Sequence, residues 1–529
     1  MKLKTAAVLL FAFPVMLLAA AEGGVFVNSD AWMFWYKPAE KMTKEEVIAD
    51  VDDFVRGGGV RAVFFNMNFQ RTFFPTEVGT VIWKDVTFSD KGELLLRGKP
   101  MSGLHGRGGY AALVKNAKLL WERVPDLMTV RYRRCHEKGV EMWHSMRMND
   151  VHYAMGWYEH RPQHSDLWID HGPELVRAWH RHWRMWNWTD NTFDYGQKRV
   201  REYHLGIIRE YLMNWESDGI ELDWLRHMPF FKPGYDEVNT PVLTQFMRDV
   251  RKTADEAGKK WGHPIRIAVR VPQNVEDAMA CGMDVAAWAR EKLVDIVIPS
   301  SGDTCTYLQT QVALWRIVAP EPVILAPCII NDIAGLGGNM GRTLETDNGF
   351  ASSFYQMGAD TIYFYNHFPR VAGEKEGESQ RRAFAAASDR KKAADSARRH
   401  ILTRPHAVGE ARFGTPVVPG SIAKNASASF RINAGDAVKG RKCRVSVGFR
   451  RAVKCDLWIN CVKVPLLHAE TPFTDSLPKN LKPVFVQADM PDGVLHDGWN
   501  VIEIWNLEDP PIVAADIVWA EIRVEAAGK

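Results

Sequence analysis

Cysteine is scarce in this chain. Seven residues among 529 are too few for a disulfide framework, so the fold must depend on buried apolar side chains. Cys443 and Cys455 fall on two consecutive predicted strands and could pair with each other. No zinc-ligand spacing occurs among the cysteines, so we expect neither a bound metal nor a cofactor.

Net charge is also small. The formal charge is +3, and Lys2 and Lys4 supply two of these charges. This balance does not favour nucleic acid or an anionic membrane as a partner. The chain also lacks a phosphate-binding loop, a dinucleotide-binding fingerprint and a serine nucleophile elbow. These absences exclude several large enzyme classes.

The N-terminus contains an apolar run that is short for a bilayer span. Lys2 and Lys4 precede an apolar segment from Thr5 to Leu18, and Ala19-Ala20-Ala21 follows it, which is the order of a secretory signal peptide. We predict a signal peptide over residues 1–21 and export to the periplasm or the medium. A membrane anchor is the alternative, and we expect no membrane association once the signal is removed.

Short β-branched or aromatic runs alternate with helical segments between residues 24 and 370. This pattern is typical of parallel strands with crossover helices, and eight such strands close a barrel. The fold class we predict is therefore α/β, a (β/α)8 TIM barrel over residues 22–403. The eight strands are Val25 to Asn28, Ala62 to Asn66, Val140 to Met146, Gly219 to Trp224, Arg266 to Val271, Val294 to Pro299, Pro322 to Ile329 and Thr361 to Asn366.

The pattern changes after Thr403-Arg404-Pro405 to short alternating strands, which predict a small all-β sandwich over residues 404–529. This segment resembles the galactose-binding-like β-sandwiches through Leu457-Trp458-Ile459-Asn460 and the run from Gly498 to Ile504. Such a domain either binds carbohydrate or braces the barrel, and the sequence leaves both roles open.

Two acidic residues lie on the predicted fourth strand, within Ser217-Asp218-Gly219-Ile220-Glu221-Leu222-Asp223-Trp224-Leu225-Arg226. Side chains alternate along a strand, so Ile220, Leu222 and Trp224 should face the helices. Glu221 and Asp223 should then point into the barrel, with Asp223 at the carboxyl end, where barrel enzymes place catalytic groups. The structural alternative is an ion-pair network of these acids with Arg266 and Arg270.

Hydrolysis of a glycosidic bond needs a second carboxyl group. Asp303 follows the sixth strand in a flexible turn from Pro299 to Thr304, which would let it reach across the barrel. We therefore predict Asp303 as the acid/base. Other acids near strand ends are Asp150, Asp277 and Glu345.

The barrel resembles the bacterial family-10-like glycosyl hydrolases. The resemblance rests on the run from Asp218 to Arg226, on Asn66-Met67-Asn68-Phe69-Gln70-Arg71 and on Met357-Gly358-Ala359-Asp360-Thr361-Ile362-Tyr363. It implies a barrel that hydrolyses sugar bonds. An acid on strand four and another on strand six is also similar to α-galactosidase-type barrels, which implies Asp223 as nucleophile and Asp303 as acid/base. Strand seven ends without a Glu, unlike the xylanase pattern.

Polar and aromatic side chains at the strand ends suit a carbohydrate pocket, so we expect an oligo- or polysaccharide as partner. Three arginines in this group would also suit an anionic glycan. Two alternatives stay open: a non-catalytic glycan-binding barrel, and a metal-dependent hydrolase suggested by the many histidines between His144 and His204. The predicted substrate contacts are His144, Arg147, Asn149, Asp150, Trp224, Arg226, Arg270, Gln273, Tyr365, Asn366 and His367.

Overall fold

The computed structural model describes residues 23–31, 33–34, 37–100, 109–152, 163–177, 191–302, 305–368, 374–404, 417–467 and 481–528. The predicted signal peptide lies outside these ranges. Within them, no helix combines the length and the apolar character that a membrane crossing requires.

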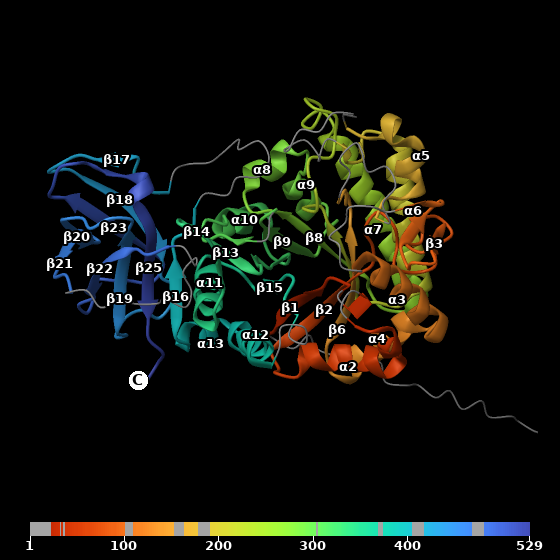
Figure 1. Cartoon of the computed structure of the whole chain (residues 1–529), viewed down its shortest axis with the longest axis horizontal. Helices are drawn as coiled ribbons and strands as arrows, with labels where there is room; N and C mark the ends of the chain where they lie inside the picture. Colours follow the sequence, from red (N-terminus) through yellow and green to blue (C-terminus); the bar gives the residue numbers. More distant parts are fainter. Residues whose placement is uncertain are drawn as a thin grey trace, which may run out of the picture.

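A nine-stranded sheet forms the centre of the larger domain (Figure 1). All neighbouring strands in it are parallel, and every predicted barrel strand contributes to it. In spatial order its strands are β11 (Ile324–Leu325), β9 (Ile296–Ser300), β8 (Arg266–Pro272), β7 (Gly219–Asp223), β6 (Glu141–Arg147), β2 (Val60–Asn66), β1 (Val25–Ser29), β15 (Tyr363–Phe364) and β12 (Cys328–Ile329).

The predicted seventh strand is divided. β11 pairs with β9 and β12 pairs with β15, while Ala326 and Pro327 lie between them. The ladder therefore does not form the continuous closed ring of eight strands that we predicted. The physical reason is Pro327, which has no N–H to donate to a ladder. Its carbonyl still accepts a hydrogen bond from the Tyr363 N–H at 3.1 Å.

Two apolar layers lie on either side of this sheet. The inner layer lies on the sheet face opposite to the helices and includes Phe26, Phe64, Trp143, Ile296 and Tyr363. The outer layer lies between the strands and the helices that surround them. These helices are η1 (Ala39–Lys41), α2 (Lys44–Val55), α3 (Gly109–Arg123), α4 (Leu127–Glu137), α5 (Asp166–Leu175), α6 (Lys198–Asn214), α7 (Thr240–Trp261), α8 (Val275–Ala280), α9 (Val285–Arg290), α10 (Val312–Val318), α11 (Leu344–Gln356), α12 (Glu374–Ala387) and α13 (Arg390–Asp395).

Two small sheets occur in the connections of the larger domain, the first antiparallel and the second mixed. One follows β2, and the other follows β9 and β12. The first contains β3 (Val86–Phe88), β4 (Leu94–Leu96) and β5 (Lys99–Pro100), and the second β10 (Cys305–Thr306), β13 (Asp332–Gly335) and β14 (Gly338–Gly341). The second sheet is mixed because β10 and β13 pair in parallel.

The C-terminal part is all β, in two four-stranded antiparallel sheets and one strand pair. β16 precedes the predicted boundary at residue 404, yet it pairs with β25 in this part. The first sheet has the order β16 (Arg398–Ile401), β25 (Ile517–Val524), β19 (Cys443–Phe449) and β22 (Val484–Asp489). The second has the order β18 (Ser427–Asn433), β23 (Trp499–Asn506), β20 (Cys455–Ile459) and β21 (Val462–Val464), and β17 (Ser421–Ile422) pairs with β24 (Ile512–Val513).

The suggested disulfide is wrong. Cys443 begins β19 and Cys455 begins β20, which belong to different sheets, and all seven cysteines are free thiols.

Candidate functional site

Strand β7 positions its side chains as the period of two predicts. Ile220 and Leu222 are buried in the outer apolar layer. Glu221 lies on the opposite face, where Oε1 accepts a hydrogen bond from the Tyr363 hydroxyl at 2.9 Å. Gly219 belongs to the same inner face, and a Cβ at that position would lie 2.4 Å from the Trp143 ring. A larger residue there would collide with the Trp143 ring.

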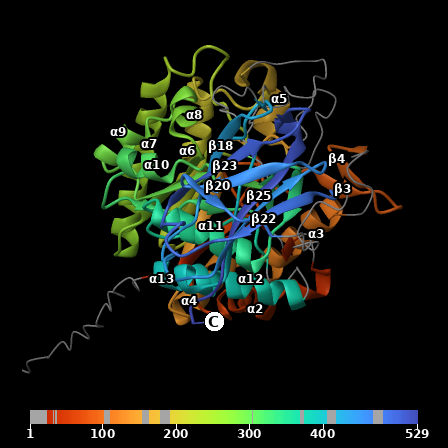
Figure 2. The same ribbon diagram turned by 90° about the vertical axis from the view of Figure 1, so that its left-hand side faces the viewer.

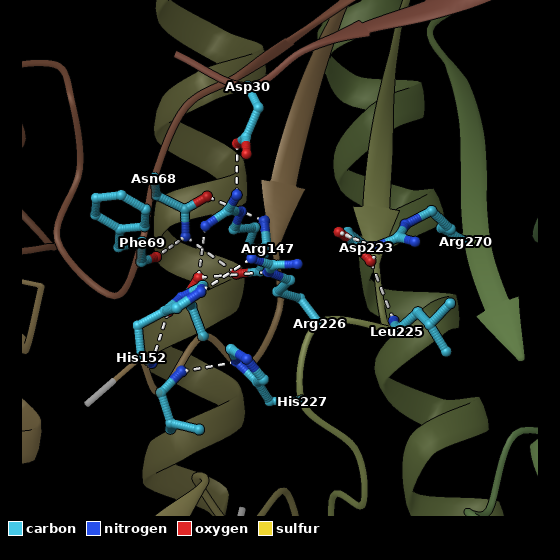
Figure 3. Close-up of polar contacts among 12 residues, drawn as sticks. Asp30, Asn68, Phe69, Arg147, His152, Asp223, Leu225, Arg226, His227 and Arg270 are labelled. Carbon is cyan, nitrogen blue, oxygen red and sulfur yellow. Dashed lines mark hydrogen bonds and ion pairs between the residues drawn. The ribbon is translucent and has the colours of Figure 1, made fainter. Parts of the chain in front are cut away.

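Asp223 is held by Arg270 in a two-pronged ion pair (Figure 3). Arg270 Nε donates to Oδ1 and Nη2 donates to Oδ2, each at 3.0 Å. The Leu225 N–H donates to Oδ1 at 3.1 Å. Only 1% of Asp223 is exposed, so this arrangement replaces water around a buried carboxylate. Burial alone would lower the pKa of Arg270, but the negative charge of Asp223 raises it.

The register explains this pairing. Asp223 lies opposite Arg270 on β8 and opposite Arg147 on β6, so three charged side chains meet at the carboxyl ends of adjacent strands. Arg266 lies opposite Gly219 instead, and its guanidinium binds Glu141 at 2.6 Å. Of the two arginines considered for the acids of β7, only Arg270 reaches one of them.

Glu221 lies one layer below Asp223 and has no arginine bonded to it among the described residues. Burial, and secondly the charge of Asp223, raise its pKa to about 7. Below that pH the Glu221 carboxyl group keeps its proton and adds no negative charge beside Asp223. The protonation of Glu221 is therefore linked to the charge of Asp223, and its predicted catalytic role remains a prediction.

The raised pKa makes stability depend on pH. Between about pH 4.5 and 7 the folded protein keeps a proton on Glu221 that the unfolded chain releases. The free energy of unfolding should therefore fall by on the order of 3 kcal/mol across that range. Glu221→Gln should remove this contribution to the pH dependence of the free energy of unfolding. Guanidinium unfolding of both proteins at pH 5 and pH 8 measures the difference. Glu276→Gln, at an exposed position on α8, is the control, and parallel pH profiles for both variants would contradict the assignment.

A second group of hydrogen-bonded charged side chains lies beside Asp223. Arg147 donates from Nη2 to Asp30 at 2.5 Å and from Nη1 to Asp150 at 2.8 Å. Asp150 accepts from His152 Nδ1 at 2.7 Å, and Arg226 donates to His152 Nε2 at 3.0 Å. Burial would raise the pKa of Asp150, but the nearby His152 and Arg147 hold it well below its usual range.

Asp150, His152 and His227 place possible metal-ligand atoms within 4.8 Å of one another. Their hydrogen bonds do not suit a cation. The Nδ1 of His227 accepts from the Val151 N–H at 3.0 Å, so its Nε2 carries the proton and has no lone pair to offer. Both ring nitrogens of His152 are engaged by Asp150 and Arg226. This group is therefore better described as a hydrogen-bonded network than as a metal centre.

The structure brings together five of the predicted site residues beside Glu221 and Asp223. Arg147, Asp150, Arg226 and Arg270 belong to the contacts above, and the Tyr365 ring lies 4.2 Å from the Arg270 guanidinium carbon. Asp303, the predicted acid/base, lies outside the described residues. Strand β9 ends at Ser300, whose hydroxyl accepts from Arg270 Nη1 at 2.9 Å, so the segment leading to Asp303 starts beside the ion pair.

Other predicted contacts lie elsewhere. Trp224 is fully buried against Phe230 and Phe246 in the outer layer, and His144 packs on Tyr211 of α6. The Asn149 side chain is hydrogen-bonded to the backbone of Phe193. The backbone carbonyl of Gln273 accepts a hydrogen bond from the Trp315 indole N–H. His367 is buried beside Phe364 and Phe384. Asn366 is half-buried and has a positive φ of 58°. None of these six has a hydrogen bond or ion pair with the side chain of Asp223 or Arg270 in the described structure.

Five side chains in the contacts described above were not predicted: Asp30, His152, His227, Ser300 and Tyr363. Asp30 directly follows β1 and His152 follows β6 by a few residues, so both occupy the strand ends that barrel enzymes use. That positional signal could have identified them. Tyr363 occupies an inner-layer position like the apolar residues around it, and its contact with Glu221 is visible only in three dimensions.

Comparison with known proteins gives no family. No family model and no curated protein matches the chain, so the resemblance to family-10-like glycosyl hydrolases remains a prediction.

Solved structures with a similar arrangement include α-galactosidase AgaA of Geobacillus stearothermophilus in complex with raffinose, 12% identical with a TM-score of 0.37 over 92% of this chain and 56% of that one. An α-amylase from Geobacillus thermoleovorans complexed with acarbose is 9% identical, with a TM-score of 0.36 over 92% and 99%. α-L-Fucosidase isoenzyme 2 from Paenibacillus thiaminolyticus is 12% identical, with a TM-score of 0.39 over 68% and 48%. The chain spans little more than half the length of the first of these. With every TM-score below 0.5, the argument for function rests on the site.

Proposed function

We propose that this protein is a glycosidase that cleaves an oligo- or polysaccharide with two carboxyl groups, Asp223 as nucleophile and Asp303 as acid/base. In this proposal the divided nine-stranded sheet is a (β/α)8 barrel with its site at the carboxyl ends of the strands. The signal-like residues 1–21 would direct export to the periplasm or the medium.

The Asp223–Arg270 pair supports this proposal most directly. A nucleophilic carboxylate must be deprotonated and fixed in orientation before it attacks the anomeric carbon. Arg270 places a positive charge against Asp223, and together with the Leu225 N–H it fixes the orientation of the carboxylate. Among the described residues, Oδ2 accepts from Arg270 alone, which leaves this oxygen a lone pair for attack.

The short segment from Ser300 to Asp303 supports Asp303 as the second carboxyl group. Asp303 is the third residue after Ser300, which touches Arg270, and a step of three residues spans at most about 10 Å. A retaining glycosidase needs its two carboxyl groups about 5–5.5 Å apart, so the segment is short enough to keep Asp303 near Asp223.

The proposal is tested by incubating the purified protein with a panel of neutral and anionic polysaccharides and measuring released reducing ends. We expect at least one substrate to be cleaved, with the configuration of the anomeric carbon retained in the first product by NMR. A glycan-binding barrel without chemistry is the second candidate, favoured by the complete burial of Asp223. It would bind a polysaccharide from the panel and release no reducing ends.

Arg226 favours an anionic sugar at this site. Arg147 and Arg270 have carboxylates at hydrogen-bond distance, whereas Arg226 Nε lies 4.0 Å from Asp150 and its side chain is 21% exposed. A carboxylate or sulfate group of the substrate could complete its hydrogen bonds.

On matched neutral and uronic-acid oligosaccharides, we expect Arg226→Gln to lower kcat/KM about 10- to 100-fold for the anionic substrate alone, since one charged hydrogen bond contributes about 1.5–3 kcal/mol. An equal loss on both substrates would show that Arg226 only supports His152.

A further inference from the structure

The outward face of the second β sheet carries a group of tryptophans that the proposed active site does not use. Along β18, β23, β20 and β21, alternate residues point inward and are buried, among them Phe430, Ile502 and Leu457. The residues between them are half-buried or exposed. They form the tryptophan face: Ser427, Ser429, Arg431, Trp499, Val501, Glu503, Trp505, Asp456, Trp458 and Lys463.

This face lies away from the barrel. The first sheet of the β domain packs closely on the barrel through β16, where a Cβ on Gly349 of helix α11 would be 2.0 Å from the Arg399 carbonyl oxygen. In Figure 1, β20 and β21 lie at the far end of the molecule from the barrel, and β18, β23 and β20 face the viewer in Figure 2. The second sheet contacts α11 through Asn433 at the end of β18, and Asn433 is not part of the tryptophan face.

Two tryptophans on adjacent strands form the centre of the face. The rings of Trp458 and Trp505 have centroids 6.3 Å apart and planes inclined by 43°. Glu503 lies directly opposite Trp458 on the neighbouring strand, and Asp456 lies opposite Trp505. Asp456 is bonded to Lys463 at 2.6 Å. Glu503 has no hydrogen-bond or ion-pair partner within the described part of the chain.

We propose that the tryptophan face binds a neutral polysaccharide, with Trp458 and Trp505 stacking on sugar rings and Glu503 accepting hydrogen bonds from their hydroxyl groups. Aromatic faces suit the apolar C–H surface of a sugar, and an ionised carboxylate is a strong acceptor for hydroxyl donors. The face has two acidic residues, Asp456 and Glu503, and two basic ones, Arg431 and Lys463, so it has no net charge to attract a polyanion. Charged groups are depleted at the core of protein interfaces, and this face intersperses four of them with its rings.

The test uses full-length Asp223→Asn protein, so that hydrolysis does not erode the ligand. Native electrophoresis is run in gels containing galactomannan, xyloglucan, arabinoxylan or mixed-linkage β-glucan, with polygalacturonate as the anionic comparison. At least one neutral polymer should retard the protein. Trp458→Ala with Trp505→Ala should weaken that retardation at least about ten-fold in Kd, since two stacking contacts are lost. Trp261→Ala, which removes a half-buried tryptophan from helix α7, should leave it unchanged.

Retardation by polygalacturonate alone, by no neutral polymer, or equally in the double tryptophan variant would overturn the proposal. If the double variant does not fold, Glu503→Gln decides, because it removes one charge from the face and must raise Kd at least about three-fold. The result is independent of the catalytic proposal, since binding here is measured without turnover.

Discussion

Asp223→Asn is expected to lower kcat by about 10⁴-fold or more on any substrate that the wild-type protein cleaves. Asparagine keeps the size and one acceptor oxygen but cannot form the covalent bond to the anomeric carbon. The loss should fall on kcat rather than on KM, because the side chain acts on the reacting bond and not on the rest of the sugar. Initial rates with the best substrate of the panel, at a temperature where both proteins are folded, measure this effect.

An external nucleophile supplies the control. Azide should restore turnover in Asp223→Ala and give a glycosyl azide of inverted configuration, because a small anion can occupy the space of the missing carboxylate. Glu276→Gln removes a carboxylate from an exposed site and should keep full activity. If Asp223→Asn retained more than about a tenth of wild-type kcat, Asp223 would be a structural acid and another group would do the chemistry.

The orientation of the acids was predictable because it depends only on local geometry. The period of two along Gly219–Asp223 places Glu221 and Asp223 on the inner face, and the structure has them there. The same period places Trp224 outward, so its prediction as a sugar contact contradicted the pattern from which it was drawn. His144 fails for the same reason, since it alternates with Trp143 and Ser145 on β6.

The partners of these acids could not be predicted, because they depend on register between strands. Arg266 and Arg270 have the same residue type and lie on the same strand face, and only the alignment of β7 with β8 decides that Arg270 meets Asp223. The broken seventh strand and the pairing of β16 with β25 are likewise long-range features. Asp30 and His152 lie in connections without periodicity, so nothing local predicts that Arg147 and Asp150 bring them together.

Arg270→Met is expected to lower the free energy of unfolding by about 3–5 kcal/mol, because it leaves Asp223 buried without its counter-charge. Asp223→Leu should lower the free energy of unfolding by a similar amount, because it leaves Arg270 buried without its counter-charge. The double variant should be far more stable than the sum of the two single losses, since a buried ion pair replaced by apolar groups is often close to neutral. Guanidinium unfolding of the four proteins at pH 7 gives the coupling energy.

Arg209 and Glu256 form the comparison pair, linking helices α6 and α7 at 2.6 Å with side chains 54% and 35% exposed. Because solvent screens that pair, its removal should hardly change unfolding. If Arg270→Met were as mild as Arg209→Met, the Asp223 carboxylate would not depend on Arg270 for its charge, and the argument that this arginine prepares it for attack would fail. A large coupling energy together with full activity in the double variant would contradict the catalytic role and leave the ion pair as a purely structural element of the barrel.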